Sequence, residues 1–172
     1  MKFKNLWLLA ASVILITACG DDDEKPSNSL TYDGNKQVIQ YASFDGSELE
    51  DGNYDLLLSP TIDGEDQGIT LQISSEWNAK TVKLTEVDDE FDWSWYVRYY
   101  ATENDVTNTV FEGFGGSVAE FEDVTGGTLY IKLINAEQKI FEVKATIQTT
   151  AGKTMKVYYK GKFVDSDASA IQ

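Results

Sequence analysis

GTLYIKLINAEQKIFEVKATIQTTAGKTMKVYYKGKF, residues 127–163, alternates apolar and polar side chains along most of its length. This alternation indicates β-strands with one buried face, because successive side chains of a strand point to opposite sides of the sheet. The positions expected to be buried are Leu129, Ile131, Leu133, Phe141, Val143, Ala145, Ile147, Met155, Val157, Tyr159 and Phe163. Those expected to face water are Tyr130, Lys132, Glu142, Lys144, Lys156, Tyr158 and Lys160. The stretch therefore predicts three antiparallel strands.

A short loop in the same stretch predicts the register. In Thr150-Ala151-Gly152 the glycine stands where a type I turn followed by a bulge needs a left-handed residue. This loop sets Glu142 opposite Lys160, and the preceding hairpin can set Lys132 opposite Glu142. Exposed pairs of this kind contribute only about 0.2 to 1 kcal/mol each. They help to specify the register and add little stability.

Period-two alternation recurs through the rest of the chain, and the sequence contains no heptads, phosphate loops or internal repeats. Strands are predicted at residues 36–43, 53–59, 68–74, 80–86, 92–101, 107–112, 117–122, 127–134, 139–149 and 153–164. Turn signals separate several of them: Asp33-Gly34, Asp45-Gly46, Asp51-Gly52, Asp63-Gly64 and Gly126-Gly127. The predicted fold class is all-β, either a single antiparallel β-sandwich or a lipocalin-like barrel of about 8–10 strands.

The N-terminal residues do not follow this pattern. Met1-Lys2-Phe3-Lys4 is a short basic head, and the apolar run at residues 6–18 is shorter than the roughly 20 residues that span a bilayer. This layout is typical of a cleaved signal peptide. The predicted organisation is a signal peptide at 1–18, a lipidated acidic tether at 19–29, a β domain at 30–165 and a C-terminal tail at 166–172.

Ile16-Thr17-Ala18-Cys19 contains the single cysteine of the chain. The motif resembles the lipobox of bacterial lipoproteins, with Ile16 and Thr17 in place of the commoner leucine and alanine or serine. The resemblance implies that signal peptidase II cuts before Cys19, whose thiol receives a diacylglyceryl group and whose amine is acylated, for example with palmitate. The alternative is an ordinary secretory signal that leaves a free cysteine near its end.

Gly20-Asp21-Asp22-Asp23-Glu24 follows the cysteine directly. An acidic cluster at this position resembles the export signal of Bacteroidetes-type surface lipoproteins. The resemblance implies lipid anchoring in the outer membrane with the protein facing the cell surface, and retention facing the periplasm is the alternative. The membrane contact is then the lipid on Cys19, because two or more acyl chains suffice for stable anchoring. The tether has no apolar side chain to bury and is expected to be disordered.

Charge limits the partners and is unevenly spread. The chain has 14 basic residues, 29 acidic residues and a net charge of −15, so no nucleic-acid partner is expected. Residues 126–164, in contrast, carry seven lysines against Glu137 and Glu142. Two interpretations are open. Either the acidic and basic regions pair across one sheet or sandwich, or the lysines form a basic ligand face.

The sequence predicts no catalytic residue, no cofactor and no metal site. It contains no histidine, which excludes Ser-His and Cys-His nucleophile systems and histidine-ligated zinc and haem. Carboxylate pairs of the kind used by glycosidases are abundant, but among 29 acids they carry no specificity. Residues 63–66 and 88–92 cluster oxygen ligands that suit calcium but lack EF-hand spacing, and we interpret them as solvated acidic loops.

Three short segments loosely resemble the small all-β lipoproteins of unknown function common in Bacteroidetes-type envelopes. They are Leu30-Thr31-Tyr32-Asp33-Gly34, Gly127-Thr128-Leu129-Tyr130-Ile131 and Tyr158-Tyr159-Lys160-Gly161-Lys162-Phe163. A lipocalin-like barrel is similar in size. The Gly-x-Trp signature expected near its first strand is missing, since Trp77 follows Ser75-Glu76, and this departure argues against a lipocalin-type ligand cavity.

The most aromatic segment is FDWSWYVRYY, residues 91–100. As a strand it directs Trp93, Trp95, Val97 and Tyr99 to one face and Ser94, Tyr96, Arg98 and Tyr100 to the other. The first face is predicted to be core. Two interpretations are open for Tyr96, Arg98 and Tyr100. Either they contact a carbohydrate by stacking and hydrogen bonding, or neighbouring elements cover them and Arg98 stacks on a tyrosine.

These features predict a non-enzymatic, lipid-anchored protein of the cell envelope. The expected role is that of a surface-displayed binding or accessory component with a glycan or protein partner. The alternatives are a structural or assembly subunit that pairs through strand edges and a carbohydrate-binding lipoprotein.

Overall fold

The predicted C-terminal strands form the centre of one sheet. The computed structural model describes residues 27–85, 93–116 and 123–166. Its strands β9 (Val124–Asn135), β10 (Ile140–Thr149) and β11 (Thr154–Lys162) pair antiparallel, with Glu142 opposite both Lys132 and Lys160. Gly152 has a φ of +73° in the turn before β11. The predicted register and its turn are therefore confirmed.

Sheet A extends this meander on both sides. β11 pairs with β1 (Ser29–Tyr32), and Asp33-Gly34 turns the chain into β2 (Asn35–Val38). On the other side β9 pairs with β6 (Thr81–Lys83). The strand order is β2-β1-β11-β10-β9-β6, and every pairing in the sheet is antiparallel.

Sheet B is built from the strands in the middle of the chain. Its order is β12 (Val164–Asp165), β3 (Tyr41–Phe44), β4 (Asn53–Ser59), β5 (Gln67–Ser74), β7 (Trp93–Glu103) and β8 (Val106–Gly116). β12 runs parallel to β3, and the other pairings are antiparallel. Two short helical turns among the described residues lie at strand ends: α1 (Gly46–Glu50) precedes β4, and a 3-10 turn (Ser75–Trp77) follows β5.

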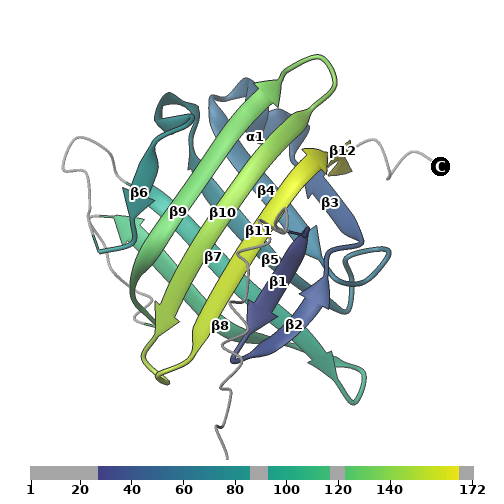
Figure 1. The fold of residues 1–172 in the computed structure, drawn as a ribbon, viewed down its shortest axis with the longest axis vertical. Helices are drawn as coiled ribbons and strands as arrows, with labels where there is room; N and C mark the ends of the chain where they lie inside the picture. The colour runs from purple at the N-terminus through teal and green to yellow at the C-terminus, as the bar shows by residue number, and fades with distance from the viewer. Residues whose placement is uncertain (1–26, 86–92, 117–122, 167–172) are drawn as a thin grey trace, which may run out of the picture.

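The two sheets pack face to face as a β-sandwich, with the strands of sheet A running across those of sheet B (Figure 1). The chain passes between the sheets at short corners. At one of them Phe163 alone separates β11 in sheet A from β12 in sheet B. Each sheet keeps two edge strands of its own, so the sandwich is correct and the barrel alternative is wrong.

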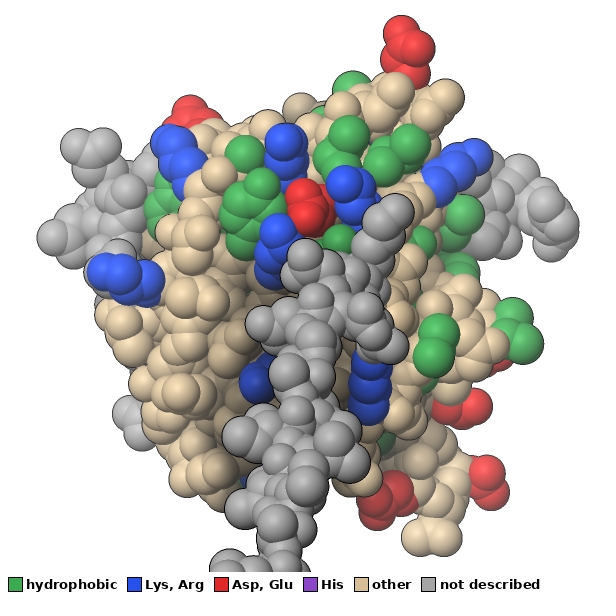
Figure 2. Space-filling view, viewed as in Figure 1, with side chains coloured by type: hydrophobic (Ala, Val, Ile, Leu, Met, Phe, Trp, Pro, Cys, Tyr) green, Lys and Arg blue, Asp and Glu red, His purple; other side chains and the backbone are tan. Residues whose placement is uncertain are grey.

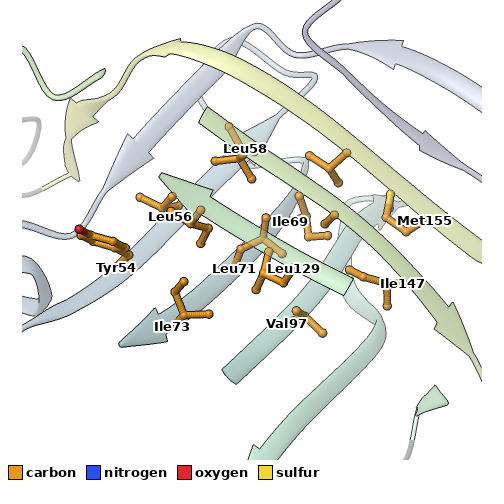
Figure 3. Packing of buried hydrophobic residues seen from close by; sticks show 14 of the residues in the cluster. Tyr54, Leu56, Leu58, Ile69, Leu71, Ile73, Val97, Leu129, Ile147 and Met155 are labelled. Carbon is orange, nitrogen blue, oxygen red and sulfur yellow. The ribbon is translucent and has the colours of Figure 1, made fainter. Parts of the chain in front are cut away.

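The core lies between the sheets (Figure 3). Leu71 and Val97 of sheet B and Leu129 and Ile147 of sheet A are 0% exposed. Full burial of a side chain of this size contributes roughly 1.5 to 3 kcal/mol. The odd-numbered positions predicted to be buried in residues 127–163 all face this core, some of them only partly buried.

Aromatic rings close one end of the core. The ring of Phe141 lies edge to face against those of Tyr54 and Phe163, with centroid separations of 5.5 and 5.1 Å. Offset and edge-to-face pairs of this kind add about 0.5 to 1.5 kcal/mol beyond the area they bury. They join β4, β10 and the corner before β12, so this end of the sandwich does not depend on strand pairing alone.

Several predicted elements differ from the structure. Residues 36–43 form two strands rather than one, because Ile39 N–H donates to Asn28 O beside sheet A while Gln40 N–H donates to Ser59 O in sheet B. The N-terminal strand β1 and helix α1 were not predicted. Gly126-Gly127 lies inside β9 and not in a turn. The predicted strand at 117–122 lies outside the described residues.

Candidate functional site

The predicted aromatic trio lies on the outer face of sheet B. In β7 the side chains of Trp95, Val97 and Tyr99 are at most 4% exposed, which confirms them as core, while Trp93 lies outside the described side chains. Tyr96, Arg98 and Tyr100 alternate with them and project outward. The structure therefore places the three residues together on one face.

Intramolecular contacts occupy this trio. The hydroxyl of Tyr100 donates to Gly64 O, and a Cβ at Gly68 would lie 2.9 Å from Tyr100 Cζ, so the ring lies against the backbone of β5. The hydroxyl of Tyr96 donates to Glu112. Burial, with that carboxylate as a further cause, raises the pKa of Tyr96 to about 12. Both rings are half-buried, as the packing interpretation expects.

Arg98 is the exposed member of the trio. Its Nε donates to Thr109 Oγ1 at 3.1 Å, and its Cζ lies 6.0 Å from the centroid of the Tyr100 ring. A guanidinium over a tyrosine ring gains about 0.5 to 1 kcal/mol at an exposed site. The side chain is thus held over Tyr100 by contacts within the protein.

The surroundings of the trio are acidic. A groove of about 390 Å³ beside Tyr96 is lined by Glu48, Asp51, Asn53, Gln72, Tyr96 and Phe114. Asn53 Nδ2 donates to Glu48 Oε2 at 3.1 Å, which holds the carboxylate at the rim. Among the residues that the structure describes, no group of three or more acids, cysteines or histidines could hold a metal ion. The acidic residues at 88–92 lie outside them.

The outer face of sheet A has the opposite charge, and we call it the basic face. The register places seven exposed lysines there: Lys36, Lys83, Lys132, Lys144, Lys156, Lys160 and Lys162. Glu142 is the one acid among the described strand positions of this face. Lysine side chains surround an acidic one over β9, β10 and β11 (Figure 2). Half of the 14 basic residues of the chain therefore lie on one face.

Two cross-strand rows organise the basic face. One row crosses all six strands with only threonine and lysine: Lys36, Thr31, Lys156, Thr146, Thr128 and Lys83. The adjacent row sets Lys144 between two tyrosines: Val38, Ser29, Tyr158, Lys144, Tyr130 and Thr81. Hydroxyls, amines and two half-buried rings therefore alternate across the sheet.

A groove of about 690 Å³ runs along these rows. Most of its lining comes from the two rows: Ser29, Thr31, Lys36, Thr81, Thr128, Tyr130, Lys144, Thr146, Lys156 and Tyr158. No carboxylate lines it among the described residues. The groove is larger than the acidic one beside Tyr96 and presents donors from side chains on six strands.

Glu142 pairs with a lysine at the centre of the basic face. Lys144 Nζ lies 2.9 Å from Glu142 Oε1 and 5.2 Å from the centroid of the Tyr130 ring. The hydrogen bond from Lys144, with Lys160 and Lys132 nearby, holds the pKa of Glu142 below its usual value. The same bond raises the pKa of Lys144. Both groups are therefore charged at neutral pH, and one carboxylate faces several ammonium groups.

The lysine-rich segment of the sequence indicated a basic surface but did not show where in the fold this surface lies. Residues 126–164 are rich in lysine, and most of these lysines stand at even positions opposite a buried odd set. Among the described residues, an ion pair from Lys153 Nζ to Asp33 at 3.8 Å favours the pairing interpretation, because it joins the basic and acidic regions at the turns. Lys36 and Lys83 come from distant segments, and only the strand order brings them to the basic face.

Comparison of the chain with protein-family models, curated protein sequences and solved structures found no match to any of them. None of the helices in the described part of the chain is long and apolar enough to span a membrane. Cys19 and residues 20–24, the predicted lipidation site and export signal, lie outside the described residues.

Proposed function

We propose that the protein is a non-enzymatic, lipid-anchored binding component displayed on the outer surface of the cell envelope. The lipobox-like motif that ends at Cys19 supports the anchor, and the acidic residues 20–24 support surface display. In this proposal the lipid on Cys19 is the membrane contact, and the sandwich stands clear of the membrane on the tether. The β domain, and not the lipid, contacts the binding partner.

The basic face is the observation that carries the binding role. Seven lysines and a tyrosine pair share one face of a chain whose net charge is −15. Solubility alone does not require lysines to cluster on one face, and clustering costs electrostatic energy because like charges repel one another. A ligand that brings negative charge would relieve that repulsion. This supports the basic face as the contact surface.

Metabolic labelling tests the anchor. Cells grown with a clickable palmitate analogue are expected to label the wild-type protein and to leave Cys19→Ser unlabelled. The matched control is the double variant Cys19→Ser with Ser27→Cys, which keeps one thiol but moves it away from the lipobox. An unlabelled wild type, or a labelled double variant, would contradict lipidation at Cys19.

Protease treatment of intact cells tests surface display. The wild-type protein is expected to be digested before the outer membrane is breached. A variant with Asp21→Asn, Asp22→Asn, Asp23→Asn and Glu24→Gln keeps the lipid and is expected to become protected. Digestion of both proteins would show that the acidic cluster is only a tether, and protection of both would place the protein inside.

An assembly subunit that pairs through strand edges remains the second candidate. The observation in its favour is β8, an eleven-residue strand at one edge of sheet B. The two candidates differ in oligomeric state, because edge pairing requires a second chain.

A further inference from the structure

We propose that the basic face binds an acidic polysaccharide, a chain of sugar rings that carry carboxylate or sulfate groups, laid across the strands of sheet A. This inference rests on the proposed binding function and names its ligand class. The groove along the two cross-strand rows is the site, with Lys36, Lys144 and Lys156 as the cations and Tyr130 and Tyr158 as the ring contacts.

Charge selects an anionic ligand and directs it to this face. The rest of the chain is strongly acidic and repels anions. Among the described strand positions of the basic face, in contrast, Glu142 is the one acid. A field of one sign on one face raises the local concentration of the opposite ion and orients its approach. Anions are therefore attracted to sheet A and turned away from sheet B.

The spacing of the tyrosines suits sugar rings. Tyr130 and Tyr158 lie in one row with Lys144 between them, on strands separated by β10. Neighbouring strands lie about 4.8 Å apart, so the backbone positions of the two tyrosines are separated by roughly 10 Å. This is about the length of two linked pyranose units. Each tyrosine can then contact a sugar. Lys144 bonds Glu142 and lies over the Tyr130 ring, and its ammonium group has three donors, so further donors can meet the acid group between the two sugars.

The length of the rows suits a polymer. The Thr-Lys row crosses six strands, a distance on the order of 24 Å at the same strand spacing. Its cations, Lys36, Lys156 and Lys83, are spread along the row and are separated by threonine hydroxyls. Hydroxyls both donate and accept hydrogen bonds, as the hydroxyl groups of a sugar require. A small anion would use only a fraction of this surface.

Other polyanions fit the basic face less well. Arg98 is the single arginine of the chain and lies on sheet B, so the basic face lacks the planar fork that binds phosphate in a bidentate manner. An acidic peptide would satisfy the lysines but would leave the paired rings and threonine hydroxyls without a role. The acidic residues 20–24 of the chain itself are a peptide of this kind, and they are one of the outcomes that the experiment separates.

Calorimetric titration of the purified protein tests the proposal. The probes are polygalacturonate, dextran sulfate, neutral dextran, poly-L-glutamate and a single-stranded DNA oligomer, all at the same low ionic strength. We expect binding of polygalacturonate or dextran sulfate that weakens as salt is added, and no binding of neutral dextran. The comparison of the first two probes identifies the acid group as carboxylate or sulfate.

Variants locate the site. The triple variant Lys36→Gln, Lys144→Gln and Lys156→Gln is expected to weaken binding by about 10-fold or more, because each exposed ion pair contributes a modest amount. Its matched control is Lys80→Gln with Lys139→Gln and Lys153→Gln, which changes the net charge equally away from the groove. Tyr130→Thr with Tyr158→Thr keeps strand propensity and is expected to weaken polysaccharide binding without changing poly-L-glutamate binding. Circular dichroism verifies that each variant is folded.

Each other outcome overturns a specific part of the proposal. Equal loss in the two lysine triples would show that only net charge matters. Binding of DNA or poly-L-glutamate as tight as that of the polysaccharides would reject the ligand class. If the intact protein binds no polysaccharide but a variant without the charges at 21–24 does, the tether is identified as the occupant of the basic face. The titration does not depend on anchoring, so its failure is distinct from failure of the labelling or protease experiments.

Discussion

In Asp55 a charged side chain occupies a partly buried position, and the two features conflict. It stands in β4 on the outer side of sheet B, covered by the turn that begins at Asp45 and contains Glu48. Burial, together with the negative charges of Asp45 and Glu48, raises its pKa to about 6. The ionised form of Asp55 is therefore less favourable in the folded protein than in the unfolded chain.

This conflict predicts a pH dependence of stability. An acid whose pKa is higher in the folded state binds more protons there, so the free energy of unfolding falls as pH rises from about 4 to about 6. We expect Asp55→Asn to raise the free energy of unfolding by about 1 to 2 kcal/mol at pH 8 and to change it little at pH 4. This is less than the full value of two pKa units, because the carboxyl is partly solvated.

Urea unfolding of the wild type and Asp55→Asn at several pH values measures this difference. Asp105→Asn, at the exposed tip of the hairpin between β7 and β8, controls for the change in net charge. A stabilisation by Asp55→Asn that is equal at pH 4 and pH 8 would show that the penalty is not electrostatic.

Sequence alone identifies Asp55 only as one acid among 29. Its environment depends on α1, a helix of five residues that is too short to show a helical period. Asp45 caps α1 through bonds from Ser47 N–H at 2.9 Å and Glu48 N–H at 3.2 Å. Asp45-Gly46 carries the correct residue for a cap, and the same pair is also a turn signal. The local sequence does not decide between the two.

At the scale of the element, the bulged end of the β9–β10 pair depends on one glycine. Gly127 has a φ of +125°, and a Cβ at this position would lie 1.9 Å from the backbone oxygen of Thr146. The register between the strands shifts next to it, between Gln148 and Thr149. Only glycine allows the two backbones to approach so closely.

Gly127→Ala is therefore expected to destabilise the protein by roughly 2 to 4 kcal/mol, because it adds both backbone strain and a clash with main-chain atoms. Gly152→Ala is the matched control, since Gly152 also has positive φ but no atom within 4 Å of the added Cβ. We expect the control to cost only about 1 kcal/mol of strain. Thermal unfolding of both variants measures the difference, and equal losses would show that the close approach in β9 carries no energy.

The long strands were predicted from sequence more accurately than the first three short ones, of which β1 was missed and β2 and β3 were merged into one. β10 and β11 each show several full alternations, and their register follows from one glycine turn. β1, β2 and β3 have four residues each, which is too few for a period to be distinguished from a loop. Gly126-Gly127 could not be assigned from sequence for a similar reason, because a glycine pair occurs both in turns and in β-bulges.

At the scale of the whole molecule, the sandwich could not be distinguished from a barrel by sequence. Both folds bury one face of every strand, and they differ in which strands pair over long sequence distances. The strand order decides the matter here, because the strands form two separate sheets, each with its own edge strands. Prediction of the basic face from sequence had the same limit, because it also depends on long-range strand pairing. The lysines of β9–β11 gave a signal in the sequence, but Lys36 and Lys83 join them only through long-range pairing.

The edges of the two sheets bear on the choice between the two proposed functions, a binding component and an assembly subunit. β2, β6 and β12 have four, three and two residues, too short to hold a second chain. β8 is longer, but Glu112 N–H donates to Asp123 Oδ2 at 3.3 Å, and Val124 packs so close to Gly113 that a Cβ there would lie 2.3 Å from it. The chain itself therefore covers this edge at Glu112 and Gly113.

The first half of β8 is open, with Val106 and Val110 56% and 40% exposed, but it ends at a hairpin tip that carries Glu103 and Asp105. Two copies pairing there would bring like charges together. We therefore expect a monomer in sedimentation velocity over a wide range of protein concentration, and no change in Val110→Lys. A concentration-dependent dimer that Val110→Lys dissociates would contradict this prediction and would favour the assembly function, because only edge pairing requires that valine to be apolar.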